Sequence, residues 1–313
     1  MTLSNRKILR TLLCLLAGTL YAVCLSACGA KEPLSENRDA EIESPVIAND
    51  LSNQKVTAIA EDTQGHIWIG TFRGLNKNNV HDYHQYFCTD DSLGLPDNQI
   101  THLLRDSKNR FWVGTVNGVC LYTDKDNFRI IPIEADNKNV RQILEDRNGR
   151  IFLNTGFQLY AYHPREEKIT CVLPEISPGN AFYAQCHIAP DNNLWVMTST
   201  GLRCYDPSTL QLKESVALSG YPYYSYLHNN ELWITGNHTL SIFDTRTRSF
   251  KPLPQPIARN TTLCNADIDY IHPYGNNGLL LNTARHGMFY YNPGTGSVTR
   301  QGENGFPFEM PRF

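Results

Sequence analysis

The sequence contains six copies of a repeat of about 42 residues, and this periodicity constrains the fold more than any other feature. The clearest copies are residues 56–75, VTAIAEDTQGHIWIGTFRGL, and residues 100–119, ITHLLRDSKNRFWVGTVNGV. Each has an apolar run, an Asp, a polar turn, a second apolar run that contains Trp, then Gly-Thr, two variable residues and a Gly. Weaker copies begin at residues 140, 183, 223 and 268.

One position of the repeat carries a large apolar side chain in every copy, and we call it the tryptophan position. Its residues are Trp68, Trp112, Phe152, Trp195, Trp233 and Leu280, separated by 44, 40, 43, 38 and 47 positions. All four tryptophans of the chain occupy it. A flat ring that recurs once per unit can fill the space between neighbouring sheets.

Each copy is expected to form four antiparallel strands, named a to d in chain order. Strand a precedes the Asp, strand b contains the tryptophan position, strand c follows the second Gly, and strand d ends the unit. The turns at residues 62–65 and 146–149 have the composition of tight hairpins. Short strands at this spacing predict an all-β propeller of six four-stranded blades. A parallel solenoid is the competing repeat fold, but it lacks such hairpins.

The repeats are expected to occupy residues 50–301, between a linker at 28–49 and a tail at 302–313. The segment Glu41–Ile47 resembles a short extra strand. In closed propellers an N-terminal strand completes the last blade, but here each unit already has a strand d. Two arrangements therefore stay open. One is an incomplete seven-bladed propeller, either truncated or closed by a partner, and the other is a six-bladed ring with an accessory strand.

The first 27 residues are expected to be a signal peptide. Arg6, Lys7 and Arg10 precede an apolar stretch, and the segment ends in Leu25-Ser26-Ala27-Cys28. This ending resembles the lipobox of bacterial lipoproteins, which implies cleavage before Cys28 and lipidation of its thiol. The protein would then be exported and lipid-anchored, on the periplasmic side of a membrane or at the cell surface. An uncleaved anchor is the alternative, because about 20 apolar residues can span a bilayer.

The net charge argues against two classes of partner. Loss of residues 1–27 removes three positive charges and no negative ones, so the formal charge changes from −3 to −6. A mildly acidic surface without a basic stripe does not suit nucleic acid or anionic lipid.

The cysteines do not form a metal-binding pattern. Six remain after the signal peptide and Cys28 are set aside, and they are Cys88, Cys120, Cys171, Cys186, Cys204 and Cys264. None forms a C-x-x-C pair or lies beside clustered His residues, so we expect no metal and no cofactor. Buried free thiols are expected rather than disulfides.

The repeat resembles a known family. The pattern D-x-x-G-x-[IL]-W-[IV]-G-T-x-x-G-[LIV] is that of the two-component regulator propeller repeats. Residues 62–75 carry it, and residues 106–119 carry it with Asn109 in place of the first Gly. The segment 94–100, GLPDNQI, is also similar to the family's approach to strand a. The resemblance extends over residues 50–301, although copies five and six match mainly by spacing.

The resemblance implies a function and exposes a difference. Propellers of this family form the exported sensing region of hybrid two-component histidine kinases, which commonly respond to breakdown products of polysaccharides. In that family an immunoglobulin-like domain, a transmembrane helix and a kinase follow the propellers. This sequence contains none of them, so signal relay would require a separate membrane sensor or propeller partner.

A ligand is expected on the face that the b–c and d–a loops share. Carbohydrate recognition needs a flat aromatic ring for the sugar's apolar face and amides or guanidinium groups for its hydroxyls. The candidate residues on that face are Phe72, Arg73, Asn98, Asn117, Asn139, Asn180, Tyr221, Tyr223, His238, Arg285 and His286. Each of them could instead serve turn geometry or cap the core.

Catalysis is not indicated by the sequence. It contains no G-x-S-x-G, H-E-x-x-H or phosphate-binding glycine motif. A propeller lyase with His102 or His187 as base is the enzymatic alternative, but Glu61 and Glu145 are expected on the opposite face. The sequence therefore favours an oligosaccharide-binding sensor, with a lipoprotein scaffold for protein partners as the second hypothesis.

Overall fold

The architecture is described from a computed structural model of the chain. It describes residues 46–79, 81–89, 94–123, 126–176, 184–275 and 277–307. All of these belong to one compact unit, Ser44–Phe313. The predicted signal peptide, Cys28 and most of the predicted linker lie outside the described residues.

The first three blades are antiparallel sheets. Blade 1 consists of β2 (Val56–Glu61), β3 (Ile67–Thr71), β4 (Gly74–Asn78) and β5 (Tyr83–Tyr86). Blade 2 consists of β6 (Ile100–Arg105), β7 (Phe111–Thr115), β8 (Gly118–Tyr122) and β9 (Phe128–Ile131). Blade 3 consists of β10 (Gln142–Glu145), β11 (Ile151–Asn154), β12 (Leu159–His163) and β13 (Lys168–Leu173).

The other three blades repeat this order. Blade 4 consists of β14 (Gln185–Ile188), β15 (Leu194–Thr198), β16 (Gly201–Tyr205) and β17 (Leu212–Ala217). Blade 5 consists of β18 (Pro222–His228), β19 (Glu231–Gly236), β20 (Thr239–Asp244) and β21 (Ser249–Lys251). Blade 6 consists of β22 (Ile268–Tyr274), β23 (Gly278–Thr283), β24 (Gly287–Asn292) and β25 (Ser297–Arg300).

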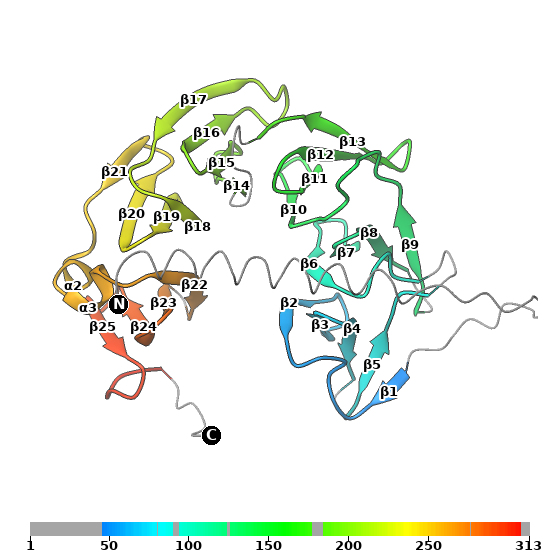
Figure 1. Cartoon of the computed structure of the whole chain (residues 1–313), viewed down its shortest axis with the longest axis horizontal. Helices are drawn as coiled ribbons and strands as arrows, with labels where there is room; N and C mark the ends of the chain where they lie inside the picture. The colour runs from blue at the N-terminus through cyan, green and yellow to red at the C-terminus, as the bar shows by residue number, and fades with distance from the viewer. Residues whose placement is uncertain are drawn as a thin grey trace, which may run out of the picture. The chain divides into compact units, whose positions relative to one another are not determined.

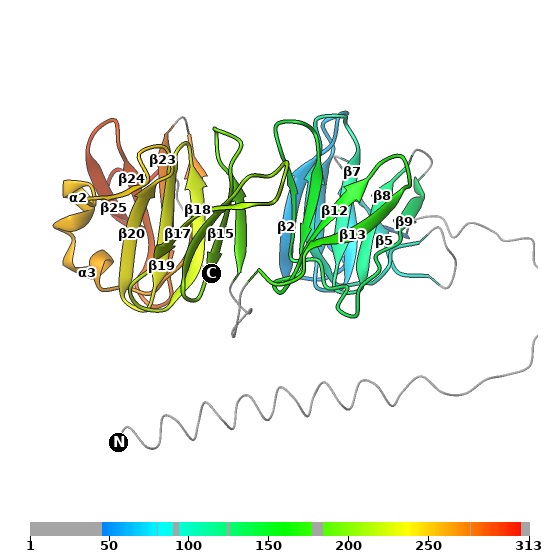
Figure 2. The ribbon, with the colours of Figure 1, turned by 90° about the horizontal axis from the view of Figure 1, so that it is seen from above.

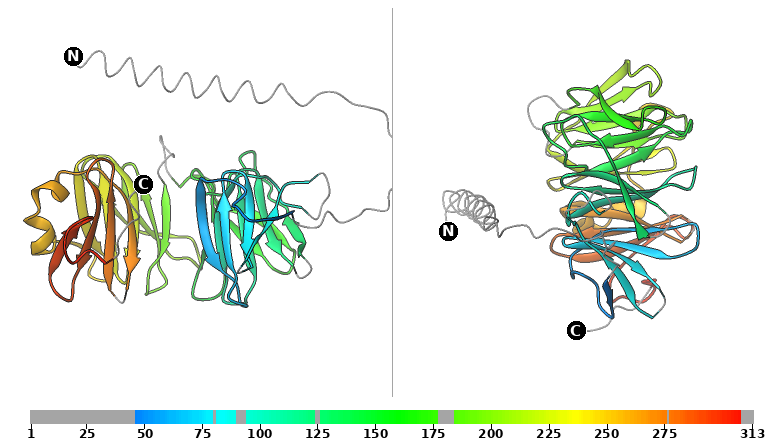
Figure 3. Two further views of the ribbon diagram at one scale, coloured as in Figure 1. Left: turned by 90° about the horizontal axis from the view of Figure 1, so that it is seen from below. Right: turned by 90° about the vertical axis from the view of Figure 1, so that its right-hand side faces the viewer.

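The six sheets follow one another around an axis, with strand a innermost and strand d outermost in each (Figure 1). Neighbouring strands within a blade pair antiparallel, which rules out the parallel solenoid. The side views show the strands running between two faces of the unit (Figure 2, Figure 3). The a–b and c–d turns lie at one face, and the b–c and d–a connections lie at the other. The predicted propeller of six four-stranded blades is confirmed.

A further strand, β1 (Val46–Ala48), overlaps the end of the predicted N-terminal strand. It pairs antiparallel with β5, so that Val46 lies opposite Gln85. Blade 1 therefore has five strands, and β1 lies at its outer edge. This is the accessory position, and β1 does not extend the last blade.

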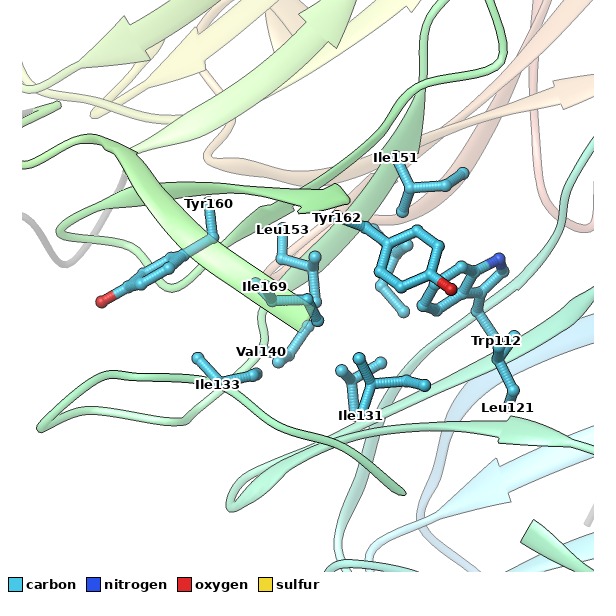
Figure 4. Close-up of a cluster of buried hydrophobic side chains, with 12 residues drawn as sticks. Trp112, Leu121, Ile131, Ile133, Val140, Ile151, Leu153, Tyr160, Tyr162 and Ile169 are labelled. Atoms are coloured by element: carbon cyan, nitrogen blue, oxygen red, sulfur yellow. The ribbon is translucent and has the colours of Figure 1, made fainter. Parts of the chain in front are cut away.

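The tryptophan position joins each blade to the next one. The ring of Trp112, in blade 2, is fully buried in a cluster with Ile151 and Leu153 of blade 3 (Figure 4). Its centroid lies 4.9 Å from that of Tyr162 in an edge-to-face arrangement. The same contact recurs from blade 1 to blade 2 and onward to blade 6. The predicted role of this position is thus confirmed.

The Asp of the repeat has two functions in blades 1 and 2. In blade 1 the Asp62 carboxylate accepts backbone N–H groups of the a–b turn and also the indole N–H of Trp68, at 2.9 Å. In blade 2 Asp106 accepts from the Trp112 indole at 2.8 Å. The aspartate closes the hairpin and satisfies the only polar group of a buried ring.

The Gly-Thr-x-x-Gly segment is explained by close packing and turn geometry. A Cβ atom at Gly70 would lie 2.5 Å from Cγ2 of Ile100 in the next blade. The Thr71 hydroxyl donates to the Gly74 carbonyl at 2.8 Å and closes the b–c turn, in which Gly74 has φ +111°. A side chain would strain that conformation.

Two short helices, which the sequence did not predict, lie in the connection between blades 5 and 6. They are α2 (Gln255–Ala258) and α3 (Thr261–Cys264). Pro254 precedes α2, and the Asn260 side chain caps α3 by accepting the Leu263 N–H at 3.0 Å. Ile257 and Leu263 are buried in the core between blades 5 and 6.

Blade 1 exposes a face that is buried in all the other blades. Ile59 is 65 % exposed, and its equivalents in blades 2 to 6 are at most 7 % exposed; these are Leu103, Ile143, Cys186, Ser225 and Ile271. Ile67 is 39 % exposed, whereas its equivalents in β7, β11, β15, β19 and β23 are at most 4 % exposed. Elsewhere this face is covered by the aromatic ring of the preceding blade. No described residue covers it in blade 1, which lies apart from blade 6 in Figure 1.

Candidate functional site

Strand a has an extra residue, a β-bulge, near its start in four blades. The pairing of strands a and b slips between residues 56 and 58, 100 and 102, 222 and 224, and 268 and 270. The residues passed over are Thr57, Thr101, Tyr223 and Asp269. Such a bulge leaves one residue outside the ladder and redirects its side chain. Arg141 and Ala184 have the equivalent places in blades 3 and 4.

Three of the bulge residues, Thr57, Thr101 and Tyr223, line a pocket of about 360 Å³ at the inner ends of the blades. It lies at the face of the b–c and d–a loops, as predicted for a ligand site. The lining includes Thr57, Thr101, Arg141, Ala184 and Tyr223, together with Gln99, Asn139, Gln142 and Gln185. Five blades contribute to it. The volume is in the lower part of the range of small-molecule sites.

Two polar atoms of the lining are buried without a hydrogen bond. They are Oδ1 of Asn139 and the hydroxyl oxygen of Tyr223. The Tyr223 hydroxyl lies near Thr235 but does not form a hydrogen bond of acceptable geometry with it. An unpaired buried polar group costs about 1–3 kcal/mol, so these atoms are suited to a ligand or a bound water.

The two glutamines of the lining hold the blades together. Gln142 Oε1 accepts the backbone N–H of Cys186 at 2.9 Å and Nδ2 of Asn154 at 2.8 Å, which ties blade 3 to blade 4. Gln185 Oε1 accepts the backbone N–H of Ser225 at 2.5 Å, which ties blade 4 to blade 5. These contacts fix the spacing of the inner strands and preorganise the pocket.

The charges near the pocket come from Arg141 in its lining and from Asp267 and Asp269, which act on Tyr223. Burial, with the charges of Asp267 and Asp269, raises the pKa of Tyr223 to about 12, so its hydroxyl is neutral at physiological pH. Arg141 brings a guanidinium group from blade 3. A ligand there would meet hydroxyls, amide groups, one aromatic ring and one cation.

The two histidines considered as catalytic bases do not line this pocket. His187 Nε2 lies 2.8 Å from the Ser225 hydroxyl, and His102 Nδ1 lies 3.4 Å from the Ile143 backbone N–H. Burial lowers the pKa of both imidazoles to about 4. Both therefore serve as neutral links between neighbouring blades.

The comparison with protein families identifies the repeats. The model described as two component regulator propeller matches residues 50–73 and 94–117, which include strands a and b of blades 1 and 2. These two segments match the two component regulator propeller repeat. A search of the curated proteins gives no match.

Solved structures share the fold of these propeller repeats. The extracellular domain of a protein classed as a one component system from B. thetaiotaomicron has a TM-score of 0.66 and 17% identity, over 80% of this chain and 37% of that chain. The corresponding domain of a protein classed as a hybrid two component system from the same organism has a TM-score of 0.64 and 18% identity, over 83% and 37%. This chain spans little more than a third of each of those domains.

A lyase also has this fold. Virginiamycin B lyase from Staphylococcus aureus has a TM-score of 0.60 and 16% identity, over 81% of this chain and 86% of that chain. At this identity the likeness concerns the architecture alone.

Two of the predicted binding residues, Asn139 and Tyr223, line the pocket of the propeller. The ring of Phe72 instead lies under the Lys55 ammonium group, 4.3 Å from it. Asn98 Oδ1 accepts the Cys88 N–H at 2.7 Å, and His238 Nδ1 lies 2.9 Å from the Asn265 carbonyl. The predicted residues that are exposed and do not line the pocket are Arg73, Asn117, Tyr221, Arg285 and His286. Asn180 lies outside the described residues.

Sequence reasoning did not select Thr57, Thr101 or Arg141. Thr57 and Thr101 lie at bulges, which simple alternation does not reveal, and Arg141 has the equivalent place in blade 3. Each follows an apolar residue at the start of its repeat copy, Val56, Ile100 or Val140. Gln142 and Gln185 were missed because polar residues on an inner strand resemble solvent-facing positions.

No metal site or membrane span is found in the described part of the propeller. Within it, no group of three His, Cys, Asp or Glu side chains is arranged to hold a metal ion. No helix there is long and apolar enough to cross a bilayer. Cys120, Cys186 and Cys204 are buried free thiols, as expected, whereas Cys88 and Cys171 are exposed and Cys264 is only partly buried.

Proposed function

We propose that this propeller binds an oligosaccharide in the central pocket and acts as the ligand-sensing part of a two-component-type signalling system. The observation that carries the proposal is a pocket lined from five blades, three of which contribute a bulge residue, that contains unpaired polar atoms of Asn139 and Tyr223. The repeat family and the likeness to extracellular domains of one- and two-component systems support a sensing role.

The chemistry of the pocket suits a neutral, hydroxyl-rich ligand. Asn139 Oδ1 would accept a hydrogen bond from a sugar hydroxyl, and the Tyr223 hydroxyl can donate to one. Thr57 and Thr101 add hydroxyls on the opposite side, and Arg141 can donate to ring or glycosidic oxygens. The Tyr223 ring offers an apolar surface for sugar C–H groups.

The proposed setting is outside the cytoplasm. The lipobox at residues 25–28 supports export and attachment to a bacterial membrane through Cys28. A lipid anchor would hold the propeller beside a separate membrane sensor that relays the signal. Neither the relay partner nor the anchor lies within the described residues.

The experiment is a thermal-shift screen of the purified protein against mono- and oligosaccharides. A ligand that binds only the folded state raises Tm in proportion to its saturation. We expect at least one saccharide to raise Tm, and we expect Asn139→Ala or Tyr223→Phe to weaken its binding roughly tenfold through loss of one hydrogen bond.

The matched control is Asn117→Ala, which changes an exposed amide of the same face outside the pocket. It should leave binding unchanged. If no saccharide raises Tm, or if binding survives in the Asn139 and Tyr223 variants, the central pocket is not a carbohydrate site.

The uncovered face of blade 1 favours a second candidate function, the docking of a protein partner. The five internal interfaces show what covers this face: a β-sheet that presents a large aromatic side chain at the tryptophan position. We therefore propose a blade-like sheet from another polypeptide as the occupant. If Ile59→Asp leaves association with such a partner intact, or if the face pairs only copies of this chain, this candidate fails.

A further inference from the structure

In blades 1, 2 and 3 an ion pair lies between the a–b turn and the side chain at the tryptophan position. An Asp of the a–b turn meets a basic residue two positions before the tryptophan position. Asp106 lies 2.7 Å from Nε of Arg110, and the Arg110 guanidinium lies over Trp112 and Tyr162, at 5.1 and 5.3 Å from their centroids. Asp62 with His66 and Asp146 with Arg150 form the same pair in blades 1 and 3.

Blade 5 lacks both members of this pair. Its a–b turn has only two residues, Asn229 and Asn230, since His228 pairs directly with Glu231. No aspartate is present in the turn, and the residue two positions before Trp233 is Glu231 instead of a base. The Trp233 side chain is 2 % exposed, and its indole N–H has no acceptor.

The Trp233 N–H points toward the end of the blade where the aspartate is missing. Trp233 has the same strand register as the other tryptophans: it lies opposite Tyr226 of strand a, as Trp68 lies opposite Ala60 and Trp112 lies opposite Leu104. In blades 1 and 2 this register aims the indole N–H at the a–b turn.

A cavity of about 700 Å³ occupies this place between blades 5 and 6. Its lining includes the whole a–b turn of blade 5, Trp233 itself, and Tyr291 of blade 6, which is the equivalent of Tyr162. The cavity thus opens where Asp106 and Arg110 would fill the corresponding space between blades 2 and 3. It is formed by a–b and c–d turns and is therefore at the face opposite the central pocket.

The cavity also holds ammonium and guanidinium groups. Lys251 Nζ lies 2.6 Å from Glu231 Oε1 and 3.6 Å from Asp244 Oδ2, and the Lys251 side chain is 43 % exposed. Arg246 adds a second positive charge to the lining, so the two cations balance the two carboxylates. An anion that enters the cavity does not meet a net negative lining.

We propose that this cavity binds a small organic carboxylate, one oxygen of which takes the place of the missing turn aspartate. That oxygen accepts the Trp233 indole N–H, and Lys251 Nζ supplies the charge partner that Arg110 provides in blade 2. Hydrogen bonds to a charged acceptor are shorter and stronger than neutral ones, which gives the site its selectivity for an acid over a neutral analogue.

The carboxylate could belong to an acidic sugar or to an aliphatic acid, and the probes separate these sources. Glucuronate represents the first, lactate the second, and glucose is the neutral control. The readout is the set of four indole N–H signals in a ¹H–¹⁵N correlation spectrum of the full chain, one for each tryptophan. The signals of Trp233 and Trp195 are assigned from their absence in Trp233→Phe and Trp195→Phe.

We expect the Trp233 signal to shift on titration with glucuronate, lactate or both, and not with glucose or sodium chloride. Trp233→Phe keeps an aromatic ring and removes the N–H donor, so it should weaken carboxylate binding roughly tenfold, as measured by the rise in Tm that each acid causes. Lys251→Met should weaken it by a similar factor. Trp195→Phe is the matched control, because Trp195 also has a buried N–H without an acceptor but does not line this cavity.

Two outcomes would overturn the proposal. The first is a Trp233 signal that stays unchanged with both acids up to tens of millimolar. The second is a Trp233 shift that glucose or chloride reproduces, or an acid-dependent rise in Tm that Trp195→Phe weakens as much as Trp233→Phe does. Tyr223→Phe in the central pocket should leave the carboxylate response intact, so this result is independent of the proposed oligosaccharide site.

Discussion

His187 Nε2 lies 2.8 Å from the Ser225 hydroxyl oxygen and links β14 of blade 4 to β18 of blade 5. The Ser225 hydroxyl donates to Gln185 Oε1 at 3.0 Å, so the imidazole must be the donor in the first contact. A neutral His187 with its proton on Nε2 therefore belongs to the hydrogen-bonded frame around the central pocket.

The first prediction concerns pH. Burial lowers the pKa of His102 and His187 in the fold to about 4, from a value of 6.5 in the unfolded chain. Below pH 6.5 the unfolded state binds protons that the folded state does not, so stability falls as the pH drops from 6.5 towards 4. Each histidine contributes up to ~3 kcal/mol to this loss. The Tm measured across this range should fall, and His187→Gln should flatten the profile.

The control for this prediction is Asn117→Ala, which replaces an exposed side chain that does not titrate. It should leave the pH profile unchanged. A profile that is the same in the wild-type protein and in His187→Gln would show that this histidine is not held neutral by the fold.

The second prediction compares two tryptophans. Trp112→Phe removes a donor from the buried Asp106 carboxylate, whereas Trp233→Phe removes an N–H that has no acceptor. Both lose similar ring area, so Trp112→Phe should destabilise the protein by about 1–2 kcal/mol more. Urea denaturation of both variants in the absence of ligands measures this difference. Equal losses would mean that the Trp112 hydrogen bond has no net effect on stability.

The third prediction concerns the uncovered face of blade 1. Ile59→Asp should change stability by less than ~0.5 kcal/mol, because that side chain is already in water. Leu103→Asp, at the equivalent buried position, should cost more than ~3 kcal/mol or prevent folding. Chemical denaturation of the two variants tests this. A large loss in Ile59→Asp would show that the face is covered in the free protein.

The fourth prediction concerns the anchor. If Cys28 carries lipid, cells fed a radiolabelled fatty acid should label the wild-type protein, and the label should appear in the membrane fraction. Cys28→Ser should abolish labelling and move the protein out of that fraction. Cys88→Ser is the control and should change neither result. Membrane retention of unlabelled Cys28→Ser would favour an uncleaved apolar anchor.

The fold could be predicted from the sequence because one interaction recurs with the repeat. Trp68, Trp112, Trp195 and Trp233 mark strand b, and the Asp before two of them marks the hairpin. The helices α2 and α3 could not be predicted, because their length is below that at which an apolar period is visible. The outer position of β1 was not predictable either, since pairing across a blade depends on tertiary contacts.

The candidate site was only partly predictable. A pocket lies at the predicted face, and two of the predicted residues, Asn139 and Tyr223, line it. Arg73 and Asn117, in b–c loops, are exposed and do not line the pocket, whereas Thr57 and Thr101, at the bulges of strand a, do line it. The cavity beside Trp233 could not be predicted from the sequence. The sequence around Trp233 differs from that around Trp112 by a shortened turn, and only the structure shows the cavity at that turn.

The uncovered face of blade 1 also affects how the propeller unfolds. In a closed ring every blade is held on both sides, and no unit is an obvious starting point for opening. With β2 and β3 supported on one side only, stability resembles that of a linear array in which the first member can fray alone. Amide protons of β2 should therefore exchange with deuterium well before those of β10 and β14.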